Sequence, residues 1–143
     1  MIREFMLGDE KSIAMLEKEC FSSPWSETAV LESLSNNTVF LVFCEQGEIL
    51  GYAGLQIVLD EGYVTNIAVT KTARGKGIGH SLVNALLSLG KQNGLAFISL
   101  EVRETNTPAI SLYKKCGFLN VGKRKNFYTN PAEDAIILTK EFK

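Results

Sequence analysis

The sequence predicts a mixed α/β fold, an α+β arrangement in which one sheet of antiparallel and parallel strands carries helices. Three apolar runs within residues 39–69 are joined by short turn segments and indicate an antiparallel meander. The run ending at Val69 is followed by a helical pattern and then by another strand, residues 97–103, which indicates a β-α-β unit with two parallel strands. The predicted order is β-α-α-β-β-β-α-β-α-β-β.

The elements before the meander are one strand and two helices. Residues 2–6 form the strand, Asp9 caps the first helix, and Ser26 caps a second helix that runs to about Leu34. The apolar faces of these helices are expected to comprise Ile13, Leu16 and Cys20 in the first, and Val30, Leu31 and Leu34 in the second.

The remaining elements follow from the apolar period and from glycine and proline positions. A long helix spans about Gly77 to Gln92 and is ended by Gly94, whereas a short helix starts at Asn106-Thr107-Pro108 and is stopped by Gly117. Strands are expected at residues 39–44, 50–59, 63–69, 97–103, 118–124 and 135–139, with turns at 45–48 and 60–62.

Length and composition favour one domain over residues 1–143, because no repeat or linker divides the chain. The net charge of −1 excludes a generally basic nucleic-acid binder. No apolar run reaches the roughly 18 residues of a membrane span, and the N-terminus lacks a signal-peptide pattern. We therefore expect a cytoplasmic protein that contacts neither nucleic acid directly nor a membrane.

The three cysteines, Cys20, Cys44 and Cys116, are far apart in apolar surroundings and show no C-x-x-C spacing. Neither a disulfide framework nor a zinc site can be read from this pattern. We expect buried, reduced thiols and no metal site.

The loop after Val69 combines alternating glycines with cations. Glycines at alternate positions allow successive backbone N–H groups to face one point, and the following helix adds its unpaired first-turn donors. This arrangement suits a pyrophosphate. The residues concerned are Gly75, Gly77 and Gly79, with Lys71, Arg74 and Lys76.

Two common nucleotide motifs do not fit this loop. A Walker loop requires Gly-Lys-Ser/Thr, but Gly77 is followed by Ile78, and a Rossmann fingerprint requires glycine where His80 stands. The alternative that binds no ligand is an ordinary strand-to-helix turn with glycines for close packing. The spacing Arg74-x-x-Gly77-x-Gly79 directly after a strand resembles instead the acyl-coenzyme A loop of the GNAT acetyltransferase superfamily.

Glu101 is a carboxylate in the middle of strand 97–103, where an unpaired buried charge costs several kcal/mol. One interpretation is a structural ion pair with Arg103 or another cation. The other is a general base, because desolvation raises a carboxyl pKa towards neutrality, where it can take a proton from an amine. Strand alternation places Ile98, Leu100 and Val102 on one face and Phe97, Ser99 and Glu101 on the other.

Tyr113 lies on the apolar stripe of the short helix, so periodicity alone predicts a core aromatic. A thioester reaction offers a second interpretation. A departing thiolate benefits from a proton donor, and a phenol with a pKa near 10 can protonate it.

Further segments resemble the bacterial ribosomal-protein alanine N-acetyltransferase family over nearly the whole chain. The resemblance implies the GNAT acyl-CoA N-acyltransferase fold, acetyl-CoA as cosubstrate, and transfer to the N-terminal alanine of a small-subunit ribosomal protein. The segments are FSSPWS (21–26), NIAV (66–69), RGKGIG (74–79), LEVR (100–103), Asn106, Ala109-Ile110, Leu112-Tyr113, Gly117-Phe118 and DAII (134–137).

The resemblance also implies residue roles. Glu101 matches the family's base and Tyr113 its acid, and the Val69 N–H becomes a candidate oxyanion donor. Asn106 matches a side chain that contacts the cofactor, although a helix cap is the alternative. The remaining cofactor-binding matches are Ile67, Ala68 and Val69 for the pantetheine arm and acetyl carbonyl, and Gly75, Lys76, Gly77, Ile78, Gly79 and His80 for the pyrophosphate.

His80 departs from the family pattern at the phosphate site, whereas Phe127 and Trp25 leave the acceptor open. His80 stands where relatives often carry arginine, and Phe127 replaces a frequent tyrosine in the basic segment 123–128, which is either a solvated surface or a rim for a peptide. Trp25 is either a hydrophobic staple for the second helix or a wall of the acceptor pocket.

The sequence thus favours acetylation of a protein N-terminal amine. Because an α-amine has a reference pKa of about 8 and lysine one of about 10.4, a single carboxylate suits the former better. The alternatives are an acetyltransferase for a small-molecule amine or internal lysine, and a coenzyme A-binding protein without turnover, against which the presence of both Glu101 and Tyr113 argues.

Overall fold

The structure is a computed structural model that describes residues 1–142. It contains seven strands, four α-helices and one 3-10 turn in the order predicted from the sequence. The elements are β1 (Ile2–Glu4), α1 (Asp9–Cys20), α2 (Glu27–Leu34), β2 (Thr38–Glu45), β3 (Glu48–Val58), β4 (Glu61–Val69), η1 (Lys71–Ala73), α3 (Ile78–Gln92), β5 (Phe97–Arg103), α4 (Thr107–Lys115), β6 (Leu119–Tyr128) and β7 (Glu133–Glu141).

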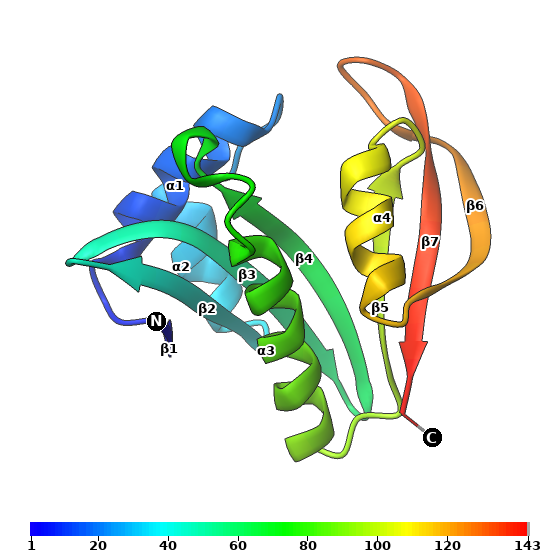
Figure 1. The fold of residues 1–143 in the computed structure, drawn as a ribbon, viewed down its shortest axis with the longest axis horizontal. Coiled ribbons are helices and arrows are strands. Elements are labelled where there is room, and N and C mark those ends of the chain that lie inside the picture. The colour runs from blue at the N-terminus through cyan, green and yellow to red at the C-terminus, as the bar shows by residue number, and fades with distance from the viewer. Residues whose placement is uncertain (143) are drawn as a thin grey trace.

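All seven strands form one sheet in the order β1-β2-β3-β4-β5-β7-β6. Every neighbouring pair is antiparallel except β4 and β5, which confirms the predicted meander and the parallel β-α-β unit. The parallel pair is short, because only residues 61–63 of β4 are in register with residues 97–99 of β5. Beyond those residues the two strands diverge, and the sheet opens into two arms (Figure 1).

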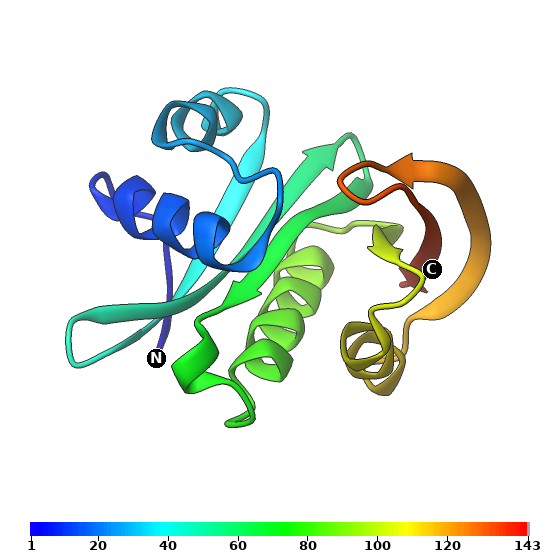
Figure 2. The ribbon, with the colours of Figure 1, turned by 90° about the horizontal axis from the view of Figure 1, so that it is seen from above.

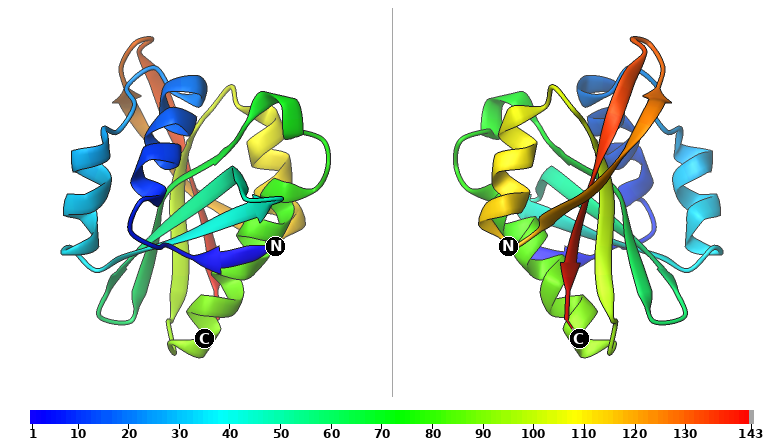
Figure 3. Two further views of the ribbon diagram at one scale, coloured as in Figure 1. Left: turned by 90° about the vertical axis from the view of Figure 1, so that its left-hand side faces the viewer. Right: turned by 90° about the vertical axis from the view of Figure 1, so that its right-hand side faces the viewer.

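Helices cover both faces of the first arm of the sheet, which comprises β1 to β4. Figure 2 shows α1 and α2 on one side of the sheet and α3 on the other, and the two views of Figure 3 show the same layers from either end. Each face has its own apolar core: Phe40, Val42 and Tyr52 pack under α1 and α2, and Leu82 and Leu86 of α3 belong to the larger core opposite. Helix α4 adds Tyr113 to that larger core beside β5 and β7.

A β-bulge interrupts the pairing of β3 with β4. Leu55 lies opposite Val64, but Ala53 lies opposite Ile67, so Thr65 and Asn66 together face Gly54. An ideal Cβ on Gly54 would lie 2.2 Å from the Thr65 hydroxyl oxygen, so only glycine fits at this position of β3, opposite the bulge. The extra residue shifts the second half of β4 by one position along β3.

Several local predictions are confirmed. The Ser26 hydroxyl accepts the Ala29 N–H at 3.1 Å and caps α2. Asn93 and Gly94, the latter at φ +68°, end α3 as expected. Strand β5 has the predicted bounds, residues 97–103.

Other predictions are wrong in detail. Gly8 rather than Asp9 is the N-cap of α1, and the Asp9 carboxylate turns back to accept the Met6 N–H and pair with Arg3 at 2.7 Å. Leu31 is 39% exposed rather than part of the apolar face of α2.

The second hairpin turn lies earlier than predicted. Because Val58 pairs with Glu61, the two turn residues are Leu59, at φ +56°, and Asp60 instead of residues 60–62. Strand β6 runs to Tyr128 instead of residue 124, and β7 covers residues 133–141 instead of 135–139.

Candidate active site

The divergence of β4 from β5 leaves backbone groups of β4 without a strand partner. The Thr70 N–H donates to the Leu50 carbonyl of β3 at 2.8 Å. Because hydrogen-bonded and non-hydrogen-bonded pairs alternate along an antiparallel ladder, the polar groups of Val69 and Ile67 point away from β3, towards the open edge. Ala68 belongs to the alternate set and is bound to β3, so the open edge presents Ile67 and Val69.

The loop that follows β4 presents six consecutive backbone donors. Within the described chain, none of the N–H groups of residues 75–80 has a hydrogen-bond acceptor, and the first bond of α3 is donated by Ser81 to Gly77. Gly75 and Gly77 have φ values of +81° and +82°, which favour glycine. An anion placed here would meet several N–H donors and the positive end of the α3 dipole.

Side chains around this loop are divided between core and solvent. Ile78 is buried in the core, so it can offer a ligand only its N–H, whereas Lys76 and His80 are exposed. The His80 Nδ1 lies 3.1 Å from the Asn84 side-chain amide. An ideal Cβ on Gly79 would lie 3.3 Å from Leu112 of α4, so this glycine permits close approach of the two helices.

An acidic residue outside the glycine motif fixes the loop, and no motif or period in the sequence predicts this role. The Glu19 carboxylate, from α1, accepts the Lys71 N–H at 2.6 Å and the Thr70 hydroxyl at 2.9 Å. The Lys71 N–H bond and then the Thr70 bond hold the pKa of Glu19 below its usual value. The Arg74 guanidinium also folds back, donating to the Val69 carbonyl and to the Cys20 sulfur, so the cation expected at the phosphate instead closes the loop.

Glu101 lies on the face of β5 opposite α3 and α4, partly exposed. Tyr63 packs edge-on against Phe97 of the same face at 5.9 Å, which places this face on the side of the sheet that carries α1 and α2. Among the described residues Glu101 has no ion pair or hydrogen bond to its carboxylate. The structural ion pair proposed as an alternative is therefore absent from this part of the chain.

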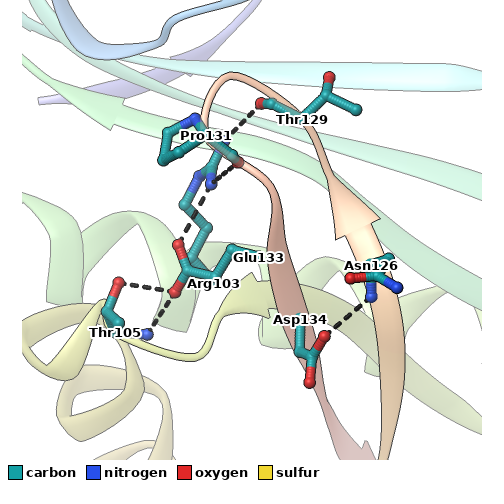
Figure 4. A network of polar contacts seen from close by, with 7 residues as sticks. All are labelled: Arg103, Thr105, Asn126, Thr129, Pro131, Glu133 and Asp134. Atoms are coloured by element: carbon teal, nitrogen blue, oxygen red, sulfur yellow. Dashed lines mark hydrogen bonds and ion pairs between the residues drawn. The ribbon is translucent and has the colours of Figure 1, made fainter.

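Arg103, the cation expected beside Glu101, is bound elsewhere. Its guanidinium donates to the Glu133 carboxylate and to the carbonyls of Thr129 and Pro131 (Figure 4). It also lies 4.5 Å from the centre of the Tyr128 ring. These contacts fix the β6–β7 turn at the open end of β5.

Tyr128 shares the surroundings of Glu101. Burial, and after it the negative charge of Glu101, raise the pKa of Tyr128 to about 12. Phe127, in edge-on contact with Tyr128 at 5.0 Å, is 44% exposed. Because Lys123 pairs with Glu104 and Arg124 lies over Phe127, the basic segment is partly bound to the protein itself.

Tyr113 is 8% exposed and packs against Phe118 with ring centroids 5.7 Å apart, as the core prediction states. Its hydroxyl has no hydrogen-bond partner within residues 1–142. Burial raises the pKa of Tyr113, which keeps the phenol protonated at neutral pH. A protonated phenol without a protein acceptor remains able to donate to a bound group.

Asn106 is the N-cap of α4, since its side-chain oxygen accepts the Ala109 N–H at 3.2 Å. The cap accounts for the oxygen only. The side-chain NH₂ has no acceptor among the described residues and could still reach a ligand.

Glu17 is a second residue that the sequence reading missed. This α1 carboxylate is 0% exposed and accepts hydrogen bonds from the Trp25 N–H at 2.9 Å, the Tyr52 hydroxyl at 2.5 Å and the Asn66 side chain at 3.0 Å. Its position four residues after Ile13, on the apolar face of α1, was the available signal. Burial is the main cause that raises the pKa of Glu17.

Trp25 contacts the core as a staple would. It packs edge-on against Phe40 at 6.4 Å, in the same cluster as Val30 of α2. The three cysteines are free but half-buried, so the expectation of buried thiols is wrong. Within residues 1–142, no group of three or more potential metal-binding side chains gathers at one point and no helix is long and apolar enough to span a membrane.

Comparisons with known proteins show the family to which this chain belongs. A sequence model of the Acetyltransferase (GNAT) family matches residues 11–118. The chain belongs to the GNAT acetyltransferase family. The predicted fold class and the resemblance to this family are thereby confirmed.

Relatives of this GNAT protein include enzymes named for a ribosomal substrate. It is 35% identical over 141 residues to the ribosomal protein bS18-alanine N-acetyltransferase of Haemophilus influenzae, covering 96% of each chain. The crystal structure of the ribosomal-protein-S18-alanine N-acetyltransferase from Escherichia coli is similar with a TM-score of 0.91 and 31% identity, covering 99% of this chain and 92% of that one. The resemblance noted in the sequence to ribosomal-protein alanine N-acetyltransferases is confirmed by these relatives.

A more distant neighbour is a chain of the NatC complex bound to Gag peptide and CoA. Its TM-score is 0.86 at 23% identity, covering 100% of this chain and 98% of that one. At this identity the likeness shows the shared fold.

We predict that Gly77→Val weakens coenzyme A binding at least tenfold, because the new side chain would lie among the unpaired N–H groups of residues 75–80. No heavy atom lies within 4 Å of an ideal Cβ at Gly77, so the fold should survive the φ strain. Calorimetric titration measures the affinity. Gly8→Val is the matched control, a positive-φ N-cap of α1 with equally open surroundings, and should lose stability without losing affinity. Equal coenzyme A affinity in the Gly77 variant and wild type would move the anion site elsewhere.

For Tyr113→Phe we predict a fall in kcat of roughly 10² to 10⁴ with little change in cofactor Kd, since only the phenol is removed. The packing against Phe118 is retained. Steady-state kinetics and a thermal melt separate the two interpretations. Full turnover with a lowered Tm would leave Tyr113 as a core aromatic alone.

Proposed function

We propose that this chain transfers the acetyl group of acetyl-CoA to the N-terminal α-amine of a protein, an alanine of a small-subunit ribosomal protein. The observation that carries the proposal is the unpaired Glu101 carboxylate beside the open edge of β4. The substrate class comes from the relatives, two of which are named for alanine of ribosomal protein S18. We further propose that residues 1–143 act as one N-acetyltransferase domain.

The residues fit the cosubstrate that this function requires. The six free N–H groups of residues 75–80 suit the pyrophosphate. The N–H and carbonyl of Ile67 and the N–H of Val69 suit an extended amide chain added to the edge of β4, whereas the Val69 carbonyl already accepts a hydrogen bond from Arg74. Bound there, acetyl-CoA supplies an activated acetyl thioester. A free side-chain NH₂ on Asn106 offers one further donor.

The amine, the acetyl carbonyl oxygen and the sulfur each then have a residue that takes a proton or donates a hydrogen bond or a proton. Glu101 takes the proton from the attacking amine, directly or through one water, as the N–C bond forms. The Val69 N–H donates to the acetyl carbonyl oxygen, where negative charge develops. Tyr113 gives its proton to the sulfur as the C–S bond breaks. Burial raises the pKa of Tyr113, so the phenol carries that proton at neutral pH but is a weaker acid than a free phenol.

The proposal places the acceptor on the face of the sheet that carries α1, α2 and Glu101. Phe127 and Tyr128, of which Tyr128 lies against Arg103, and the α1–α2 loop of residues 21–26 are the segments that we propose border the acceptor. If the acceptor is the N-terminal amine of a ribosomal protein, the enzyme acts in the cytoplasm. The proposal assigns no direct role to nucleic acid, a membrane or a metal.

A panel of three acceptors, two peptides and a small diamine, tests this function. We expect acetylation of a peptide with a free N-terminal alanine, and none of the same sequence with its N-terminus blocked and an internal lysine free, because the lysine amine needs a stronger base. Mass spectrometry after incubation with acetyl-CoA locates the added acetyl group. A small diamine serves as the third acceptor. Modification of the lysine or the diamine, with the free alanine untouched, would replace the proposed acceptor.

A further inference from the structure

We propose that Glu17 is a positioning residue that couples the acceptor side of the site to the cofactor strand. This proposal rests on the proposed function for its substrate but on the geometry of α1, β3 and β4 for its mechanism. Glu17 is buried, carries a carboxylate, and belongs to neither the phosphate loop nor the reacting groups.

The first contact of Glu17 fixes the loop between α1 and α2. Its Oε1 accepts the Trp25 N–H at 2.9 Å, at the end of residues 21–26. This loop starts beside the site, because the sulfur of Cys20 lies 3.6 Å from the Val69 carbonyl oxygen. One backbone bond therefore sets the path of a segment that borders the open edge of β4.

The second contact fixes the bulge. The Glu17 Oε2 accepts the Asn66 side-chain NH₂ at 3.0 Å, and Asn66 is one of the two residues that face Gly54. Without the extra residue, the alignment of Val64 with Leu55 would continue and place Val69 opposite Leu50 instead of Gly51. The Val69 N–H would then point into β3. Asn66 thus helps to hold the register that turns this donor to the open edge.

The third contact holds the carboxylate itself. The Tyr52 hydroxyl donates to Oε2 at 2.5 Å from β3, and burial together with the Glu17 charge raises the pKa of Tyr52. This bond helps to offset the cost of burying the carboxylate, whereas the bonds to Trp25 and Asn66 hold the loop and the bulge. Three elements, the α1–α2 loop, β3 and β4, consequently meet at one carboxyl group.

The experiment compares Asn66→Ala, Glu17→Ala and Tyr52→Phe. Asn66→Ala removes the bond to the bulge, and we expect kcat to fall roughly tenfold to a hundredfold because a catalytic donor displaced by about 1 Å loses that much. Glu17→Ala should lower kcat to a similar extent and also raise the KM for the peptide. Coenzyme A Kd should stay within about threefold, since residues 75–80 are untouched.

Tyr52→Phe is the matched control, because it removes a buried hydrogen bond to the same carboxylate. It should lower Tm while kcat and the peptide KM stay near wild type. If Glu17→Ala does not fold, Asn66→Ala decides alone, since Asn66 is only partly buried. A folded Asn66→Ala with wild-type kcat and KM overturns the proposal, as does an equal kinetic loss in Tyr52→Phe.

Amide hydrogen exchange gives a readout that needs no acceptor. Glu17→Ala should speed exchange at Trp25 and at Ala68, which is bound to β3 just after the bulge, whereas Tyr52→Phe should leave both slow. Unchanged exchange in Glu17→Ala contradicts the coupling even if the peptide proves to be the wrong acceptor. If the wild type acetylates no peptide but the two variants change exchange as expected, the substrate assignment fails and the positioning role stands.

Discussion

The short parallel pairing of β4 with β5 is the constraint on which the site depends. Three residues of each strand are in register, and beyond them each strand keeps its other neighbour, β3 or β7. Exposed backbone groups of a strand lose the hydrogen bonds of a ladder unless a ligand or water replaces them. The opening thus leaves a strand edge that can bind a ligand, and Glu101 lies beside it on the face of β5 that packs against neither α3 nor α4.

The polar residues around this opening are held by their neighbours in ways that leave the proposed reacting groups free. Arg103 binds Glu133 and two carbonyls, so Glu101 keeps an unpaired carboxylate. Arg74 and Glu19 close the loop after β4, so its donors remain available to an anion. A charged residue that lies close to a site in the sequence can therefore hold the surrounding structure in place instead of contacting a ligand.

The order of elements and the positions of the glycine loop, Glu101 and Tyr113 could be predicted because each depends on local periodicity or on a short motif. The bulge at Thr65 and Asn66 could not, because it is visible only when β4 is aligned with β3. The partners of Arg103 lie 26 to 30 positions away, and the partners of Glu17 on β3 and β4 lie 35 and 49 positions away, separations that no local pattern encodes. The same reason explains why Leu31 was assigned to the wrong face: period alone does not show which stripe meets the sheet.

The pH dependence of kcat/KM for wild type and Glu101→Gln, on a peptide with a free N-terminal alanine, tests the central claim most directly. Glutamine keeps the size of the side chain but cannot take the proton, so the rate at neutral pH should fall by roughly 10² or more. The deficit should shrink above about pH 8, where the amine is already deprotonated. Thermal melts in parallel should show little change, because Glu101 has no ion pair to lose within the described chain. A variant profile that overlays the wild type from about pH 6 to 9 would contradict the account of Glu101 as the base.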